Sequence, residues 1–173
     1  MVGPSGALRR KLQVGVDAAT GELVAAAVTT NDLGDGPLLP ELLDQIDADL
    51  VQVSGEGAYD TGACSAAISA HKAQAAMPPR RGARIWRHGN SNDPPLARDE
   101  SLRSIRRTGR GEWKRAIGYH RRNKAKTAIF GIKTIFGDRV RSCGFEGQGA
   151  QMLIRCSALN RMTHLGMPDS YAV

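Results

Sequence analysis

Two segments near the amino terminus alternate apolar residues with polar or small ones. In RKLQVGVD the apolar positions are Leu12, Val14 and Val16, and after the turn DAATGE the segment ELVAAAVTT continues as a second strand. A period of two is that of a β-strand with one buried face, and a short turn between two such strands makes a hairpin. The pattern therefore predicts a β-hairpin over residues 10–30, so the chain must build its fold on a sheet.

The middle of the chain predicts helices that alternate with two further strands. NDLGDGP is a loop that ends in helix-start chemistry, with Asp35 or Gly36 as the cap and Pro37 in the first turn of the helix LLPELLDQI. LVQVSG then predicts a short buried strand, ACSAAISAHK a helix of small residues, and AAMPP a strand ended by its prolines. This order predicts an α/β fold around a mixed sheet that begins with an antiparallel pair.

The second half of the chain predicts a loop followed by helices. Residues 80–96 are expected to be a loop, and ARDESLRSIRRT a helix with a break after it at Gly109 and Gly111. GQGAQMLIRCSALNRMTHLG predicts a closing helix. One face of that helix is formed by Met152, Cys156 and Leu159.

The stretch YHRRNKAKTAIFGIK predicts one more helix, with two different stripes. Tyr119, Arg122, Lys126 and Lys133 are three, four and seven residues apart, a spacing that places them on one side of a helix. A neighbouring apolar stripe, expected to face the core, consists of Ala125, Ile129, Ile132 and Phe136. The first stripe is almost wholly basic and contains no acid.

Positive charge is concentrated in one part of the chain. Residues 80–141 contain 18 lysines and arginines against 5 acids, a net +13, so the other residues carry −6 of the total of +7. Trp86 and Trp113 lie among these arginines, a mixture suited to phosphate contacts and to stacking on bases. The alternative is a solvated basic surface without a partner. We expect nucleic-acid contact.

Other classes of protein are disfavoured by what the sequence lacks. With 173 residues, no apolar run near 18 and no signal-peptide core, we expect one cytoplasmic domain without membrane contact. The three cysteines form no C-x-x-C pair and the four histidines lack metal-ligand spacing, which argues against a disulfide framework or a structural zinc site.

The segment GEGAYD follows a predicted strand, at the end where sites form in α/β sheets. Gly55 and Gly57 are expected to let the main chain turn tightly there. The alternative is an ordinary strand-to-helix turn in which Asp60 or Thr61 is the N-cap of the next helix.

Several segments together resemble a known family. KLQVGVDAATGELVAA, NDLGDGPLLPELLDQID, VSGEGAYDT, PPRRGARIW, the block from GYHRRN to FGIKTIFGDR, and SALNRMTHLGMPDSYAV are similar to the carboxyl-terminal two-thirds of bacterial insertion-sequence transposases of the four/five superfamily. The resemblance implies a ribonuclease-H-like (retroviral-integrase-like) mixed sheet with flanking helices, and an Asp-Asp-Glu triad that holds Mg²⁺ for DNA cleavage and strand transfer. It covers residues 9–173 as a partial catalytic domain and leaves residues 1–8 as an unrelated or disordered leader.

The resemblance also assigns the positions of the catalytic motifs. Tyr119, Arg122 and Lys133 match a motif in which Tyr, Arg, Glu and Lys share one helix, but Lys126 stands where the metal-binding Glu belongs. Glu56 stands at the position of the second Asp, which makes it the single remaining metal ligand, and a weak one. A cation at the Glu position repels a metal ion, so we expect Mg²⁺ not to be bound productively.

The resemblance places the first Asp on a strand upstream of the hairpin, which this chain does not contain. That strand is the central one of the family's sheet, so its absence is expected to leave two strand edges unpaired. Asp17 is a conceivable substitute ligand, but a turn residue is the favoured interpretation.

These features give one expected function and two alternatives. We expect a truncated, catalytically inactive transposase remnant that still binds DNA. We expect it to be associated with the nucleoid and to have no small-molecule substrate. The residues expected to contact DNA are Arg80, Arg81, Arg84, Arg87, Arg106, Arg107, Trp113, Arg121, Arg122 and Lys133. One alternative is a non-catalytic DNA-binding or oligomerising modulator of an intact transposase, as a homo- or hetero-oligomer. The other is an active enzyme whose upstream segment comes from frameshifting or a partner chain.

Overall fold

The computed structural model describes residues 10–88 and 95–166, and its chain divides into two compact units. The first unit is formed by the described parts of Met1–Leu33 and Lys124–Val173, and the second by Gly34–Asn123. None of the helices in the described ranges is both long and apolar enough to cross a membrane.

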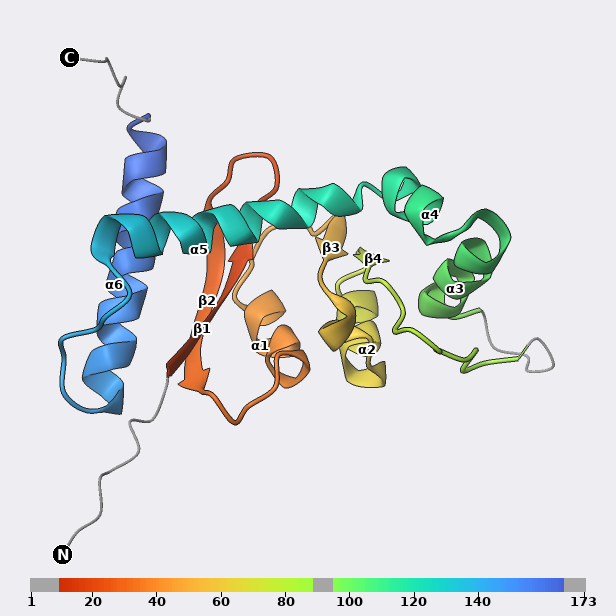
Figure 1. The fold of residues 1–173 in the computed structure, drawn as a ribbon, viewed down its shortest axis with the longest axis horizontal. Coiled ribbons are helices and arrows are strands. Elements are labelled where there is room, and N and C mark those ends of the chain that lie inside the picture. Colours follow the sequence, from red (N-terminus) through yellow and green to blue (C-terminus); the bar gives the residue numbers. More distant parts are fainter. Residues whose placement is uncertain (1–9, 89–94, 167–173) are drawn as a thin grey trace, which may run out of the picture. The chain divides into compact units, whose positions relative to one another are not determined.

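The first unit is built on the predicted hairpin (Figure 1). Strands β1 (Arg10–Val16) and β2 (Leu23–Thr30) are antiparallel, and their register shifts between Gly15 and Val16. At the turn, the Asp17 carboxylate accepts a hydrogen bond from the main-chain N–H of Ala19 at 2.6 Å, which confirms Asp17 as a turn residue. Helices α5 (Asn123–Phe136) and α6 (Phe145–His164) complete the unit.

The core of the first unit joins the hairpin to both helices. Leu23, Ala128, Ile132 and Cys156 are its buried residues. The predicted core face of α5 is thus shifted: Ala128 is buried, whereas Ala125 and Ile129 are half-buried. The reason is the close approach of α6, because Leu159 lies against Gly131, where an added Cβ would be 3.6 Å from Leu159 Cδ1. The Ala128–Ile132 side of the helix therefore turns inward.

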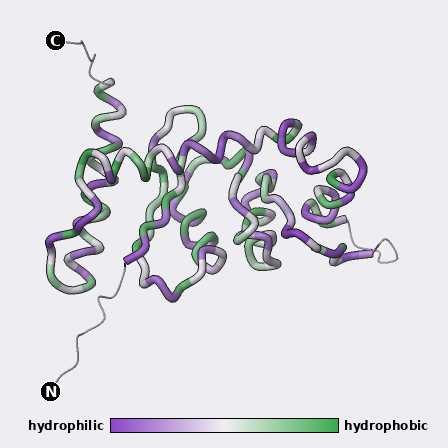
Figure 2. The backbone as a smooth tube through the Cα atoms, viewed as in Figure 1, coloured by the Kyte–Doolittle hydropathy of each residue, from purple (hydrophilic) through white to green (hydrophobic). Residues whose placement is uncertain are grey.

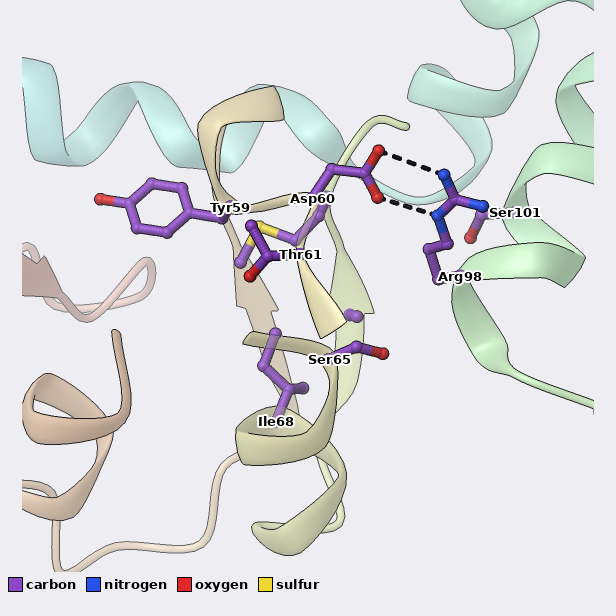
Figure 3. Close-up of a pocket in the computed structure, with 9 residues that line it drawn as sticks. Tyr59, Asp60, Thr61, Ser65, Ile68, Arg98 and Ser101 are labelled. Carbon is purple, nitrogen blue, oxygen red and sulfur yellow. Dashed lines mark hydrogen bonds and ion pairs between the residues drawn. The ribbon is translucent and has the colours of Figure 1, made fainter. Parts of the chain in front are cut away.

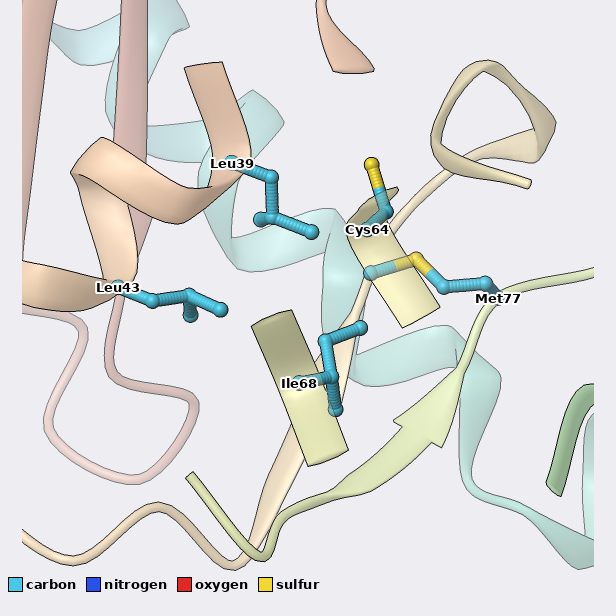
Figure 4. Packing of buried hydrophobic residues seen from close by; sticks show 5 residues of the cluster. All are labelled: Leu39, Leu43, Cys64, Ile68 and Met77. Carbon is cyan, nitrogen blue, oxygen red and sulfur yellow. The ribbon is translucent and has the colours of Figure 1, made fainter. Parts of the chain in front are cut away.

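The second unit contains the other two strands and most of the short helices. Strands β3 (Gln52–Ser54) and β4 (Gln74–Ala76) are parallel and are connected through η2 (Gly57–Tyr59) and α2 (Gly62–Ala70). Before them come η1 (Gly36–Leu38) and α1 (Leu39–Asp44), and after them α3 (Ala97–Thr108), α4 (Arg110–Ala116) and η3 (Tyr119–Arg122). Leu39, Leu43, Cys64, Ile68 and Met77 form its core (Figure 4).

The helices of the second unit fall into two groups that differ in hydropathy. The segments α1 and α2 are largely hydrophobic, whereas α3 and α4 are mainly hydrophilic (Figure 2). Leu102 is the buried apolar residue of α3, and Trp113 that of α4. These two helices therefore depend on few apolar contacts, and polar interactions must help to hold them.

The structure confirms the mixture of helices and strands but corrects several details. The strands in the described ranges form two separate two-stranded sheets instead of one. Gly111 lies inside α4, so the chain breaks at Gly109 alone, whose φ of +87° suits a residue without a side chain. Asp35 makes no capping hydrogen bond with its side chain. The strand predicted over residues 50–55 is three residues long and half-buried.

The helix predicted from Tyr119 onward is also different at its start. Tyr119–Arg122 form a 3₁₀ turn after Gly118, whose φ is +67°, and the α-helix begins at Asn123. The predicted basic stripe is thus shared between the two units: Tyr119 and Arg122 belong to the second, and Lys126 and Lys133 to the first.

Two glycines of the GEGAYD segment were expected to permit a tight turn, and the structure gives a different reason for one of them. Neither Gly55 nor Gly57 has a positive φ. A Cβ on Gly55, however, would lie 2.5 Å from Met77 Sδ and 2.9 Å from Tyr59 Cδ2. Gly55 is therefore required by close packing, whereas Gly57 has no comparably close neighbour.

Candidate functional site

Among the described residues of the second unit, the most deeply buried charges form one network at the end of η2, and Figure 3 shows its Asp60–Arg98 pair. Asp60 is 9% exposed and Arg98 7%, and Arg98 Nε donates a hydrogen bond to Asp60 Oδ1 at 2.9 Å. Arg98 Nη1 donates to Oδ1 of Asp99 at 3.0 Å, and Asp99 is fully buried. Buried charges are stable only where partners replace the lost hydration. We call these three residues the Asp60–Arg98–Asp99 network.

Asp60 is thus a buried ion-pair partner and not a helix cap. The N-cap of α2 is Thr61, whose side chain accepts a hydrogen bond from the main-chain N–H of Cys64 at 3.2 Å. Of the two alternatives for this turn, Thr61 is therefore confirmed. Asp60 Oδ2 instead accepts from the main-chain N–H of Arg80 at 2.8 Å, so the carboxylate connects the turn to the chain that follows β4.

Asp99 binds the main chain that follows β4 at a later point than Asp60 does. Its carboxylate accepts hydrogen bonds from the main-chain N–H groups of Trp86, at 3.0 Å, and Arg87, at 2.8 Å. Burial alone raises the pKa of Asp99, but these two N–H groups and the Arg98 guanidinium outweigh burial and lower the pKa below its ordinary value of 3.8. Asp99 is therefore ionised at neutral pH.

Residues 80–87, which we call the arginine segment, contain four of the residues predicted to contact DNA. Arg80 Nε donates to the main-chain oxygen of Gly57 at 3.1 Å. The side chains of Arg81 and Arg84 are exposed, and that of Arg87 is half-buried. Trp86 is 43% exposed, and the Arg98 guanidinium lies 3.9 Å from the centroid of its ring.

Glu56, at the position the resemblance assigns to the second Asp, contacts a predicted DNA-binding residue. Its Oε1 accepts from Arg122 Nη1 at 2.8 Å, and the Glu56 side chain is 56% exposed. The Arg122 guanidinium also lies 4.6 Å from the centroid of the Tyr119 ring. The structure therefore brings Glu56, Tyr119 and Arg122 together.

Tyr119 is buried among cations and an aromatic ring. Lys114 Nζ lies 5.0 Å from its ring centroid, and the ring of Trp113 packs at 6.3 Å between centroids. Burial raises the pKa of the Tyr119 phenol, and the nearby Arg122 opposes this shift only in part. Trp113 itself is 5% exposed, which corrects the prediction that it stacks on a base.

The remaining predicted cations lie on helix surfaces. Arg106 and Arg107 are exposed in the last turn of α3, and Arg121 is exposed in η3. Lys126 and Lys133 are exposed on α5, and Lys133 Nζ lies 3.8 Å from Asp138 Oδ1. Most of the residues predicted to contact DNA are thus accessible to a phosphate.

A small hollow borders the network, lined by residues that include Tyr59, Asp60, Ser65 and Arg98 (Figure 3). Burial, followed by the nearby Asp35 carboxylate, raises the pKa of Tyr59 to about 12, so its phenol stays protonated. Because Asp60 and Arg98 are already paired with each other, this hollow offers no free charge to a ligand.

The chain belongs to a transposase family: the family model described as "Transposase DDE domain" matches residues 7–161. No solved structure matches the chain. Membership implies interaction with DNA, and such transposases typically use a divalent metal ion held by carboxylates.

The side chains that the structure describes do not fit such an ion. In the described ranges, no three His, Cys, Asp or Glu side chains lie close enough together to hold a metal. Glu56 is paired with Arg122, and Asp60 is paired with Arg98. A hard cation needs several carboxylate oxygens whose charge is not already neutralised. This donor set therefore does not suit Mg²⁺.

The sequence did not reveal the roles of Arg98 and Asp99. Their partners are distant in the chain or are main-chain groups, and neither leaves a mark in a sequence pattern. One weak signal was present: an arginine in the first turn of α3 opposes the helix dipole and needs a nearby carboxylate.

Proposed function

We propose that this transposase-family protein binds DNA through phosphate contacts and does not cut it. The single observation that carries the proposal is the pairing of Glu56 with Arg122, which commits the carboxylate at the second acidic position to an internal cation. Lys126, at the sequence position of the family's Glu, is a cation instead of a metal-binding carboxylate. Together these residues favour phosphate binding over metal binding.

The distribution of charge supports the DNA-binding part of the proposal. Arg81, Arg84, Arg106, Arg107 and Arg121 all lie in the second unit with exposed side chains. Phosphate contacts of this kind provide affinity without reading bases, so we expect little sequence preference. Binding should weaken steeply as salt rises.

The finer fold belongs to the same proposal. We infer that both small sheets correspond to parts of a ribonuclease-H-like sheet. The antiparallel pair β1–β2 and the parallel pair β3–β4, the latter joined through α2, are the kinds of pairing that such a mixed sheet contains.

Two assays on the whole chain test this function. Fluorescence anisotropy with a labelled duplex of about 20 base pairs should give a dissociation constant that rises steeply between low and physiological salt. A supercoiled plasmid incubated with the protein and Mg²⁺ or Mn²⁺ should stay intact. Salt-independent binding contradicts the first part, and metal-dependent nicking that is lost in Glu56→Ala contradicts the second.

A second candidate function is favoured by apolar residues on the surface of the first unit. Ile154 of α6 is 67% exposed, Leu153 43%, and Leu165, which follows that helix, 80%. Exposed apolar residues that gather on one helix often mark a protein interface. A modulator that assembles with an intact transposase would use such a surface, and co-purification with an intact relative, lost in Ile154→Ser, tests it.

A further inference from the structure

The arginine segment has no helix or strand, yet its main chain is held at both ends by side chains. Asp60 and Asp99 accept from the N–H groups of Arg80, Trp86 and Arg87. Main-chain carbonyl groups of the segment accept hydrogen bonds as well. Arg98 Nη1 donates to the carbonyl oxygen of Arg84, and Arg103 Nη2 donates to that of Arg87 at 3.4 Å.

The same hydrogen bonds leave two of the cationic side chains, those of Arg81 and Arg84, available. Each of them uses a main-chain atom of the segment, whereas the side chains of Arg81 and Arg84 are exposed. Trp86 has its ring beside the Arg98 guanidinium and is still 43% exposed. The segment therefore combines a fixed main chain with accessible groups that suit a phosphate backbone and a base.

We propose that the Asp60–Arg98–Asp99 network is a positioning centre that holds the arginine segment ready to bind DNA phosphates. The proposal rests on the proposed DNA-binding function and extends it to residues that do not touch DNA. A disordered segment would have to be ordered upon binding, and ordering even one residue weakens affinity about tenfold. The network orders the segment before DNA binds, so binding does not carry that entropic cost.

Net charge alone and the positioning role predict opposite effects of one substitution on the affinity for DNA. Asp99→Asn removes a negative charge, so charge alone should strengthen binding to DNA. If Asp99 positions the segment, the same change should weaken binding, because an amide cannot replace a carboxylate that accepts from Trp86, Arg87 and Arg98.

The experiment compares full-length wild type and Asp99→Asn by anisotropy with the labelled duplex over a range of salt. We expect binding to be about tenfold weaker, and the slope of log K against log salt to fall by roughly 0.9 for each phosphate that the variant no longer binds. Limited trypsin digestion with mass spectrometry should show faster cleavage after Arg81 and Arg84. Leu43→Ala, which loosens the core at a residue that does not line the hollow beside the network, is the control for lower stability and should keep the wild-type slope.

The outcomes separate the two proposals. If wild type does not bind the duplex at low salt, the proposed function fails, and the positioning role fails with it. If wild type binds and Asp99→Asn binds equally well or more tightly with the same slope, only the positioning role is overturned. Should Asp99→Asn not fold, Arg103→Lys decides in the same assays, since it keeps the charge and removes the guanidinium that donates to the Arg87 carbonyl. Unchanged affinity and cleavage in that variant overturn the proposal, and weaker binding with faster cleavage supports it.

Discussion

Glu56 and Arg122 are 66 residues apart in the sequence and form an ion pair, with 2.8 Å between Glu56 Oε1 and Arg122 Nη1. The pair is partly exposed, so it contributes little to stability, about 0–1 kcal/mol. Its larger consequence concerns binding, because the carboxylate competes with any phosphate for the guanidinium.

Glu56→Gln should therefore strengthen DNA binding. With the charge of Glu56 removed, Arg122 can contact a phosphate, and the salt slope should steepen by roughly 0.9 for that contact. Anisotropy measured at several salt concentrations checks this. Glu41→Gln changes the net charge equally on the exposed surface of α1, so an equal effect of both variants would show that only total charge matters.

Lys126→Glu should increase the affinity for divalent cations. The substitution replaces a positive charge with a carboxylate on α5, and a change of this kind near a dication is expected to tighten binding about tenfold on an exposed surface. Isothermal titration with Mn²⁺ measures it. Lys126→Gln removes the charge without adding a ligand, so if it matches Lys126→Glu, a carboxylate at this position does not bind metal.

Asp99 should make the protein sensitive to acid. Its folded pKa lies below the ordinary 3.8, so the folded state holds this proton less tightly than the unfolded chain does. The stabilisation is complete above pH 3.8 and is lost as the pH falls through the folded pKa. At pH 7, Asp99→Asn should lower the free energy of unfolding by about 3 kcal/mol, because it breaks a buried ion pair. Urea unfolding of both proteins should show this difference shrinking below pH 3.8, and a constant difference would contradict the assignment.

Gly55→Ala should destabilise the second unit. The added methyl group would lie 2.5 Å from Met77 Sδ and 2.9 Å from Tyr59 Cδ2. Overpacking of a core costs about 1–3 kcal/mol, and the flexible Met77 side chain favours the lower part of that range. Thermal or urea unfolding measures the destabilisation. Gly57→Ala, where no neighbour is closer than 3.5 Å, should be much milder; equal effects would mean that packing at Met77 is not the cause.

Local sequence patterns predicted the elements well, and long-range pairing poorly. The alternation of Leu12, Val14 and Val16 predicted the hairpin because a strand's faces alternate by geometry alone. The helix over ARDESLRSIRRT matches Ala97–Thr108, since Gly109 follows it directly. The joining of the strands into one sheet was predicted from the order of the elements, and the two separate sheets show that pairing between distant strands does not follow from local pattern.

In the candidate site, too, local features were predicted and contacts between distant residues were not. The exposed arginines were predicted because a run of like charges is avoided in a core. Trp113 was misjudged because its sequence neighbours are charged, while its actual environment is Tyr119, six positions away. The Asp60–Arg98 pair spans 38 residues, and no periodicity reports such a contact.

The two tryptophans differ in their exposure to solvent, so their fluorescence can report on the arginine segment. Trp113 is 5% exposed, whereas Trp86 is 43% exposed beside the Arg98 guanidinium. A quencher dissolved in water should therefore reach Trp86 and spare Trp113, so the emission of the unlabelled chain separates into an accessible and a shielded part. DNA that covers the arginine segment would protect the accessible part, and the occupancy of that segment becomes visible without attaching a dye.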